Sequence, residues 1–162
     1  MTDRKSQLRE TIQADHEASL AILRRLTPEQ WLLPVPSDEG AEWKARDVLA
    51  HLATSEGGQL GQINRLLTGG VTVPDDFDLT RYNRRSVEKK AAQSVPELLA
   101  TIERDHDEVL KALEAVGEAD LDKAGRHARG DTITVERFFR RITSHRRRHA
   151  EEVAAAVGLR AQ

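Results

Sequence analysis

Apolar residues recur every three or four positions along four stretches of the chain, which is the spacing of one face of an α-helix. The pattern predicts long helices over about residues 2–26, 45–67, 94–117 and 135–157, and a shorter helix over 80–92. Residues 132–134 are the one β-like segment and are too short to predict a strand. We therefore expect an all-α four-helix bundle with long connections, in a single domain over residues 1–162.

Capping and breaker residues mark where these helices begin and end. Ser94 and Glu97 have the spacing of a capping box at the start of the third long helix. Residues 27–30 predict one short turn, and the prolines and polar residues of 34–40 predict a loop. Because the connections are long, the helices need not alternate in direction, and parallel neighbours joined by crossovers also fit the pattern.

The histidines are the most informative polar residues, because two of them interrupt an apolar stripe. His145 and His149 lie four residues apart on the last predicted helix, in line with Ile142 and Val153. Both imidazoles should therefore face the interior of the bundle, where they are costly unless a partner satisfies them. A pair at this spacing is a common way for a helix to present two ligands to zinc or a similar ion. Two hydrogen-bonded or partly exposed histidines in a basic helix are the alternative.

A metal site needs a third ligand, and His51, at the edge of the apolar stripe of the second helix, is the best candidate. His16 and His106 also tend inward, either to join a metal site or to lie at a seam between helices. His127 falls in a polar segment and is expected in a loop. The predicted ligands of one divalent ion are therefore His51, His145 and His149.

The segment Trp43–Ala53 resembles the second-helix motif of the DinB superfamily, in which a Trp precedes the helix, an acid follows after four residues and a metal-binding His after another four. Asp47 and His51 match the last two positions. The other two ligands of the family, a His-x-x-x-His pair on the last helix, match His145 and His149, and the resemblance covers nearly the whole chain. It implies a four-helix bundle that holds one divalent ion, often zinc or nickel, on three histidines.

The resemblance also implies relatives that use low-molecular-weight thiols, such as mycothiol- or bacillithiol-dependent isomerases and transferases. Lys44 departs from the family pattern, which often has Ser or Thr at this cap of the second helix. Asp47 can still favour the helix start through the helix dipole, or it can orient the ring of His51. A second departure is that no further domain follows the bundle, as one does in the mycothiol-dependent isomerases.

Three histidine ligands leave a divalent ion at least one open position, which is typical of a catalytic rather than a structural site. The chain has no cysteine, so disulfides, thiolate ligands and a cysteine nucleophile are excluded, and any reacting sulfur must come from a cosubstrate. We therefore expect a metal-dependent enzyme for a small-molecule substrate, either a thiol-dependent S-transferase or isomerase or a hydrolase. The pattern assigns no catalytic residue. Tyr82 and Asn83 are expected near the mouth of the site, and Glu56 is not expected to be a ligand.

Two other interpretations of the histidines remain open. One is a haemerythrin-like di-iron bundle that also uses His16 and His106, although only Glu103 and His106 have the Glu-x-x-His spacing of such sites. The other is a non-catalytic metal-binding interaction module, in which loss of the metal would unfold the chain.

Charge and hydropathy bear on partners and location. The formal net charge of −2 gives no overall attraction to nucleic acid, so we expect no nucleic-acid partner. No apolar run approaches the ~20 residues that span a bilayer, and we expect no membrane partner. The polar N-terminal segment lacks a signal core, which favours a cytoplasmic protein. A homodimer through exposed helix faces also fits the pattern.

The last helix carries an arginine cluster that could receive the carboxylates of a thiol cofactor or an acidic substrate. We favour a solvated face, because glutamates lie at helical spacing to three of these arginines. The cluster comprises Arg137, Arg140, Arg141, Arg146, Arg147 and Arg148, and the glutamates are Glu136, Glu151 and Glu152.

Overall fold

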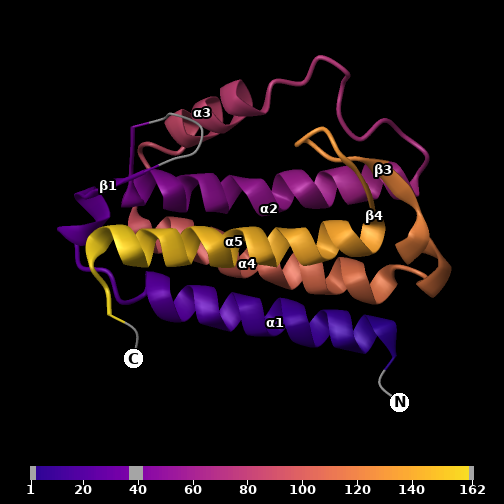
Figure 1. Cartoon of the computed structure of the whole chain (residues 1–162), viewed down its shortest axis with the longest axis horizontal. Helices are drawn as coiled ribbons and strands as arrows, with labels where there is room; N and C mark the ends of the chain where they lie inside the picture. The colour runs from indigo at the N-terminus through magenta and orange to yellow at the C-terminus, as the bar shows by residue number, and fades with distance from the viewer. Residues whose placement is uncertain (1–2, 37–41, 161–162) are drawn as a thin grey trace.

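The computed structural model describes residues 3–36 and 42–160. Within these ranges the chain forms five α-helices, two 3₁₀ turns and four short strands (Figure 1). The helices are α1 (Arg4–Leu23), α2 (Ala45–Leu67), α3 (Leu79–Lys89), α4 (Val95–Ala115) and α5 (Val135–Val157). The other elements are the 3₁₀ turns Gln30–Leu32 and Glu118–Asp122 and the strands β1 (Pro34–Val35), β2 (Trp43–Lys44), β3 (Ala124–Arg126) and β4 (Thr132–Thr134).

The four long helices form a bundle, which confirms the expected all-α architecture. Helix α5 packs against both α1 and α2, and α4 packs against the same two helices, so α1 and α2 lie diagonally across the bundle although they are consecutive in the chain. In Figure 1, α1 and α5 run in one direction, while α2 and α4 run in the other. The neighbours α1 and α5 are therefore parallel, as the long connections permit. Helix α3 lies outside the bundle, against α2.

The core has two apolar ends and a polar middle. One apolar cluster contains Trp31, Trp43 and the first turns of α2, and the other contains Phe138 and Phe139 of α5. Burial of polar side chains costs free energy unless they find partners. Apolar packing therefore does not explain why polar side chains are buried in the middle of the bundle. Its buried polar side chains include Asp15, His51, Glu56, Gln59, His106, Thr143 and Arg146.

Side-chain caps fix the starts of the helices. Ser94 and Glu97 form the predicted capping box of α4, with 2.6 Å from the Ser94 N–H nitrogen to Glu97 Oε2 and 3.3 Å from the Glu97 N–H nitrogen to Ser94 Oγ. At the start of α2, Lys44 has no side-chain acceptor, and Asp47 instead accepts a hydrogen bond from the Lys44 N–H at 2.9 Å. Asp47 therefore stabilises the helix start, and it does not orient His51, whose Nδ1 has no hydrogen-bond partner.

The structure contains two small antiparallel ribbons that the sequence pattern does not predict. Strand β1 pairs with β2, and β3 pairs with β4. Each ribbon leads directly into a long helix, β2 into α2 and β4 into α5, so the ribbons set the entry of the two helices that carry the candidate ligands. Strands of two or three residues are too short to show an alternating pattern, which is why the periodicity does not reveal them.

The helix bounds agree closely with the pattern. Helices α2 and α5 match it, whereas α1 and α3 each end three residues earlier than expected, at Leu23 and Lys89. The short turn expected over 27–30 begins later, as a 3₁₀ turn whose first N–H, on Gln30, is capped by Thr27 Oγ1 at 3.2 Å. Residues 37–40 of the expected loop lie outside the described residues. No described helix has both the length and the apolar character needed to cross a bilayer.

Candidate metal centre

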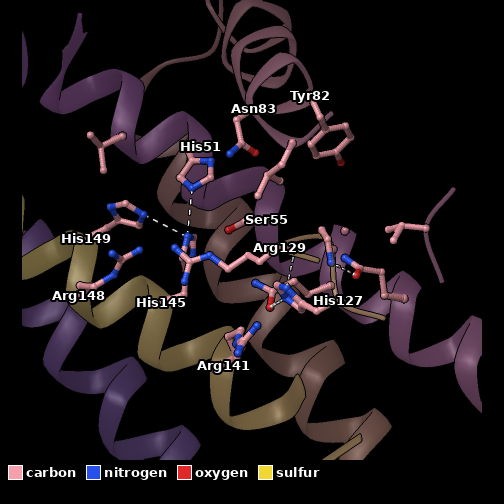
Figure 2. A pocket seen from close by; sticks show the side chains of 18 of the residues that line it. His51, Ser55, Tyr82, Asn83, His127, Arg129, Arg141, His145, Arg148 and His149 are labelled. Atoms are coloured by element: carbon pink, nitrogen blue, oxygen red, sulfur yellow. Dashed lines mark hydrogen bonds between the residues drawn. The ribbon is translucent and has the colours of Figure 1, made fainter. Parts of the chain in front are cut away.

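The three histidines expected as ligands meet between α2 and α5 (Figure 2). His51 comes from the second turn of α2, and His145 and His149 come from successive turns of α5. Nε2 of His145 lies 3.2 Å from Nε2 of His51 and 3.1 Å from Nε2 of His149. One ligand atom from each residue lies within 4.8 Å of the other two, so the group could hold a metal ion.

The spacing of these nitrogens suits a tetrahedral ion. Metal–nitrogen bonds of about 2.0–2.1 Å place the ligand atoms of a tetrahedron roughly 3.3 Å apart, close to the separations of His145 Nε2 from the other two nitrogens. The ring planes meet at 75–87°, and the short Nε2 separations show that the nitrogen-bearing edges of the rings meet in one region. Two neutral imidazoles can share one N–H, but a third lone pair at the same point has no donor. A cation satisfies all three at once.

Glu152 orients one of the three rings. Its Oε2 lies 2.9 Å from Nδ1 of His149. Donation from Nδ1–H to this carboxylate leaves Nε2 of His149 with a lone pair aimed at the other two histidines. This carboxylate–histidine arrangement is common around metal ligands, and it sets the tautomer that ligation needs.

Burial keeps the histidines in the form that binds metals. Desolvation lowers the pKa of His51 to about 3, and repulsion by a protonated His149 and by Arg148 and Arg129 acts in the same direction. Burial also holds the pKa of His145 well below its ordinary value, with help from the same neighbours. Both rings are therefore neutral at pH 7, and no proton has to leave before a metal ion binds.

The histidines form one wall of a cavity of about 410 Å³. The wall beside His51 is apolar, since Trp43 and Val48 line it and the Trp43 ring lies 5.3 Å from that of His51. Tyr82 and Asn83 of α3 also line the cavity, in agreement with the expectation that they lie near the site (Figure 2). The cavity therefore offers a small molecule access to the histidine nitrogens.

Three glycines of α2 line this cavity. Gly57, Gly58 and Gly61 all line it, although glycine within a helix costs about 1 kcal/mol relative to alanine. A Cβ at Gly58 would lie 3.3 Å from the Tyr82 hydroxyl, and one at Gly61 would meet only the Arg65 guanidinium. The absence of side chains at Gly58 and Gly61 therefore leaves space along the α2 wall of the cavity.

His127 has a role that the sequence does not predict. It lies in the turn between β3 and β4, as expected of a loop residue, yet it is buried. Its Nε2 lies 3.2 Å from Gln59 Oε1, and the Ala128 N–H donates to Gln62 Oε1 at 3.0 Å. Two glutamines of α2 therefore fasten this turn against the cavity. Only the tertiary structure brings these distant residues together.

His16 and His106 do not join the metal site. Their rings stack on each other, with centroids 3.6 Å apart, and Nη1 of Arg146 lies 2.7 Å from Nδ1 of His16. The positive charge of the Arg146 guanidinium beside this histidine pair opposes a metal ion there. Glu103 pairs instead with Arg24 on the surface. Among the described residues, the one group that could hold a metal is the set of three histidines, so the structure does not favour the di-iron interpretation.

The interpretation of the arginine cluster as a solvated face is wrong for Arg146. Its side chain is fully buried, and its Nη1 lies 3.0 Å from Oε1 of the equally buried Glu56. Helix α5 lies between α1 and α2 and therefore buries two of its faces rather than one stripe. The other predicted pairs form at 2.9–3.8 Å, namely Arg140–Glu136, Arg147–Glu151 and Arg148–Glu152.

Comparison with solved structures identifies several proteins of the same fold. The colibactin self-resistance protein ClbS, solved in complex with dsDNA, has a TM-score of 0.77 and 13% identity, over 97% of both chains. YfiT from Bacillus subtilis, described as a probable metal-dependent hydrolase with an unusual four-helix bundle topology, has a TM-score of 0.73 and 18% identity, over 98% of this chain and 91% of its own. A Clostridium difficile 630 protein of uncharacterised function has a TM-score of 0.73 and 15% identity, over 99% of both chains. No curated protein matches the sequence.

The ClbS complex corrects one expectation. The exclusion of a nucleic-acid partner is wrong, because a protein of this fold is found on double-stranded DNA. Net charge is an average over the whole chain, whereas nucleic acid responds to the local arrangement of arginines and lysines. A value of −2 therefore excludes no such partner.

The family model of the DinB superfamily matches residues 11–153, which include all of α2 and α4 and the three histidines. The fold, the order of its elements and this match agree with the motif around His51 and with the histidine pair on α5. The chain belongs to the DinB superfamily.

Proposed function

We propose that this protein is a metal-dependent enzyme that acts on a small molecule, with His51, His145 and His149 as the metal ligands. The observation that carries the proposal is the meeting of three Nε2 atoms at the wall of a cavity large enough for a substrate. Three protein ligands leave a divalent ion such as zinc or nickel with an open position, which is the arrangement of catalytic sites.

The residues of the chain would hold and shield the reacting groups. Glu152 fixes the ring of His149, and the apolar wall formed by Trp43 and Val48 limits the access of water to His51. A divalent ion bound here would supply a Lewis acid that lowers the pKa of a bound water or thiol. Ser55 and Asn83 add polar groups that can orient a ligand (Figure 2).

The scarcity of carboxylates in the cavity favours a thiol cosubstrate over water as the nucleophile. Among the described residues that line the cavity, Glu152 is the single carboxylate, and it already accepts a hydrogen bond from His149. An attacking water would therefore lack a proton acceptor on the chain. A thiol has a pKa of about 8.5 and gives up its proton far more readily. We favour a thiol-dependent S-transferase or isomerase for this reason.

Metal-dependent hydrolysis is the second candidate. It is supported by the description of YfiT, a protein of the same fold, as a probable metal-dependent hydrolase. In that case the chain would offer no free carboxylate to assist the reaction, because Glu152, the one carboxylate among the described lining residues, contacts His149.

Cobalt substitution separates the two candidates. Cobalt-loaded protein is titrated with N-acetylcysteine and, as a matched oxygen analogue, with N-acetylserine. We expect a sulfur-to-cobalt charge-transfer band with the thiol alone, and no band in the His149→Ala variant. If the loaded protein gives no such band, the thiol candidate fails and hydrolysis is preferred. If the folded protein takes up no metal, both candidates fail.

A further inference from the structure

The cavity carries an excess of positive charge that its own acids do not balance. Four arginines line it, and Glu152 is the one carboxylate among the described lining residues. The arginines are Arg65, Arg129, Arg141 and Arg148. A divalent ion on the three histidines would raise this excess further. Like charges in a partly enclosed site repel one another unless an anion is placed between them.

Three of the four arginines are already engaged within the protein. Arg141 makes two hydrogen bonds to Asp131, at 2.9 and 2.8 Å. Arg65 donates from Nε to the Thr72 carbonyl at 3.0 Å, and Arg148 lies 3.8 Å from Glu152. These contacts account for their positions without a ligand.

Arg129 differs from the other three. In the part of the chain that the structure describes, no hydrogen bond or ion pair involves its guanidinium group, and the residue is exposed to solvent. Figure 2 shows its side chain extended from the β3–β4 turn toward His145, alongside Ser55. A cation is thus held beside the candidate metal ligands without a counter-ion from the chain.

The backbone that carries Arg129 is firmly held. Its own N–H donates to Nδ1 of His127 at 3.1 Å, and the Gly130 N–H donates to the His127 carbonyl at 2.8 Å. Gly130 has a φ of +98°, a conformation that side chains rarely allow, and this closes the turn. Gln59 in turn holds His127, so the backbone of Arg129 is fixed while its guanidinium group has no partner within the described residues. Such an arrangement is suited to capture a ligand at a fixed distance from the histidines.

We infer that the substrate or cosubstrate of this site carries a carboxylate close to its reacting atom, and that Arg129 binds this carboxylate. The inference rests on the proposed function and names the class of molecule that the site selects. The planar fork of a guanidinium matches the two oxygens of a carboxylate. A bound carboxylate also supplies the negative charge that the cavity lacks, and it would lie between Arg129 and the three histidines. Arg129 is thus a specificity-determining residue.

The test compares a carboxylate with its uncharged analogue on zinc-loaded protein. Metal content is first measured by mass spectrometry, and binding of succinate and of succinamide is then measured by calorimetry. The variant is Arg129→Gln. The matched control is Arg126→Gln, which removes the same charge from the same ribbon but outside the cavity, where Arg126 pairs with Asp75.

We expect succinate to bind and succinamide not to bind. Arg129→Gln should weaken succinate binding at least about tenfold, whereas Arg126→Gln should change it less than about twofold. Metal content should be unchanged in both variants. Equal binding of succinate and succinamide, or unchanged binding of succinate to Arg129→Gln, would overturn the inference while leaving the metal site intact. Absence of bound metal in the wild type is a separate result, which contradicts the proposed function itself.

Discussion

Arg146 and Glu56 pair in the middle of the bundle, with 3.0 Å between Nη1 and Oε1 and both side chains excluded from solvent. The same Nη1 lies 2.7 Å from Nδ1 of His16, so the guanidinium links α5 to α2 and to α1. Removal of one member of a buried pair leaves the other charge without compensation, at a cost of about 3–5 kcal/mol. We predict that Arg146→Met lowers the free energy of unfolding by this amount, as measured by urea denaturation.

The neighbouring Arg147 provides the control for that measurement. It is half-exposed and pairs with Asp15 and Glu151. The exposed pair with Glu151 contributes about 0–1 kcal/mol. Buried Asp15 keeps a second contact, with Thr143 Oγ1 at 3.4 Å, so Arg147→Met should have a smaller effect than Arg146→Met. Equal losses in the two variants would show that the buried pair has no special importance for the fold.

Acid should destabilise the protein, because several buried histidines lie outside the candidate metal centre. Burial lowers the pKa of His16 to about 3 and the pKa of both His106 and His127 to about 4. In the unfolded chain these groups take up protons below about pH 6.5, whereas the folded protein does so only below about pH 4. The contribution of these three histidines to the free energy of unfolding is therefore fully present above about pH 6.5 and is lost as the pH falls.

Glu56 acts in the opposite direction. Burial raises its pKa to about 7, so its contribution to stability falls as the pH rises from about 4.5 to 7. Between pH 7 and pH 5, the three histidines lose more stabilising free energy than Glu56 gains. We therefore predict that urea denaturation gives a lower free energy of unfolding at pH 5 than at pH 7. The His16→Gln variant should show a weaker dependence on pH. A stability at pH 5 that equals or exceeds the value at pH 7 would be inconsistent with the buried neutral histidines.

Glu152 should control metal affinity without contributing a ligand. Loss of a carboxylate that orients a ligating histidine typically weakens metal binding 10–100-fold, and we predict a change of about this size for Glu152→Gln. Glu151→Gln is the matched control, because Glu151 pairs with Arg147 on the surface. Competition with a chromophoric zinc chelator measures both. Equal affinities in the two variants would mean that the contact with His149 has no influence on the site.

Two glycines should respond to alanine in opposite ways. A Cβ at Gly61 would meet only the Arg65 guanidinium at 3.5 Å, so Gly61→Ala should stabilise the helix by about 1 kcal/mol. A Cβ at Gly125 would lie 2.8 Å from Leu66 Cδ1, so Gly125→Ala should cost about 1–3 kcal/mol. Thermal unfolding measures both changes. A loss of stability in Gly61→Ala would mean that the glycine is required by the helix rather than by the cavity.

The local pattern predicts the features of this protein that depend on a single helix. The spacing of His145 and His149 within an apolar stripe predicts that both rings face the interior of the bundle, and the bounds of α2 and α5 follow from the same periodicity. His51 is the best third candidate because it lies at the edge of the apolar stripe of α2, and the Trp-acid-His motif supports it through a family resemblance. These inferences need no knowledge of how the helices are arranged.

Helical periodicity does not predict features that depend on how two or more helices or strands pack together. Arg146 is buried because α5 packs against both α1 and α2, so more than one of its faces is covered. His127 can be buried because Gln59, far away in the sequence, accepts a hydrogen bond from its Nε2–H. The free tip of Arg129 depends on the same turn. Helical periodicity predicts which face is apolar, but not which neighbours cover the remaining ones.

Metal content shows whether His51, His145 and His149 hold an ion. Wild-type protein, His149→Ala and His16→Gln are reconstituted with zinc, dialysed and analysed by mass spectrometry, with circular dichroism to confirm that each is folded. We predict about one ion per chain in the wild type and in His16→Gln, and loss of the ion in His149→Ala. A folded wild type without bound metal, or a His149→Ala variant that retains the wild-type content, would contradict the three-histidine centre.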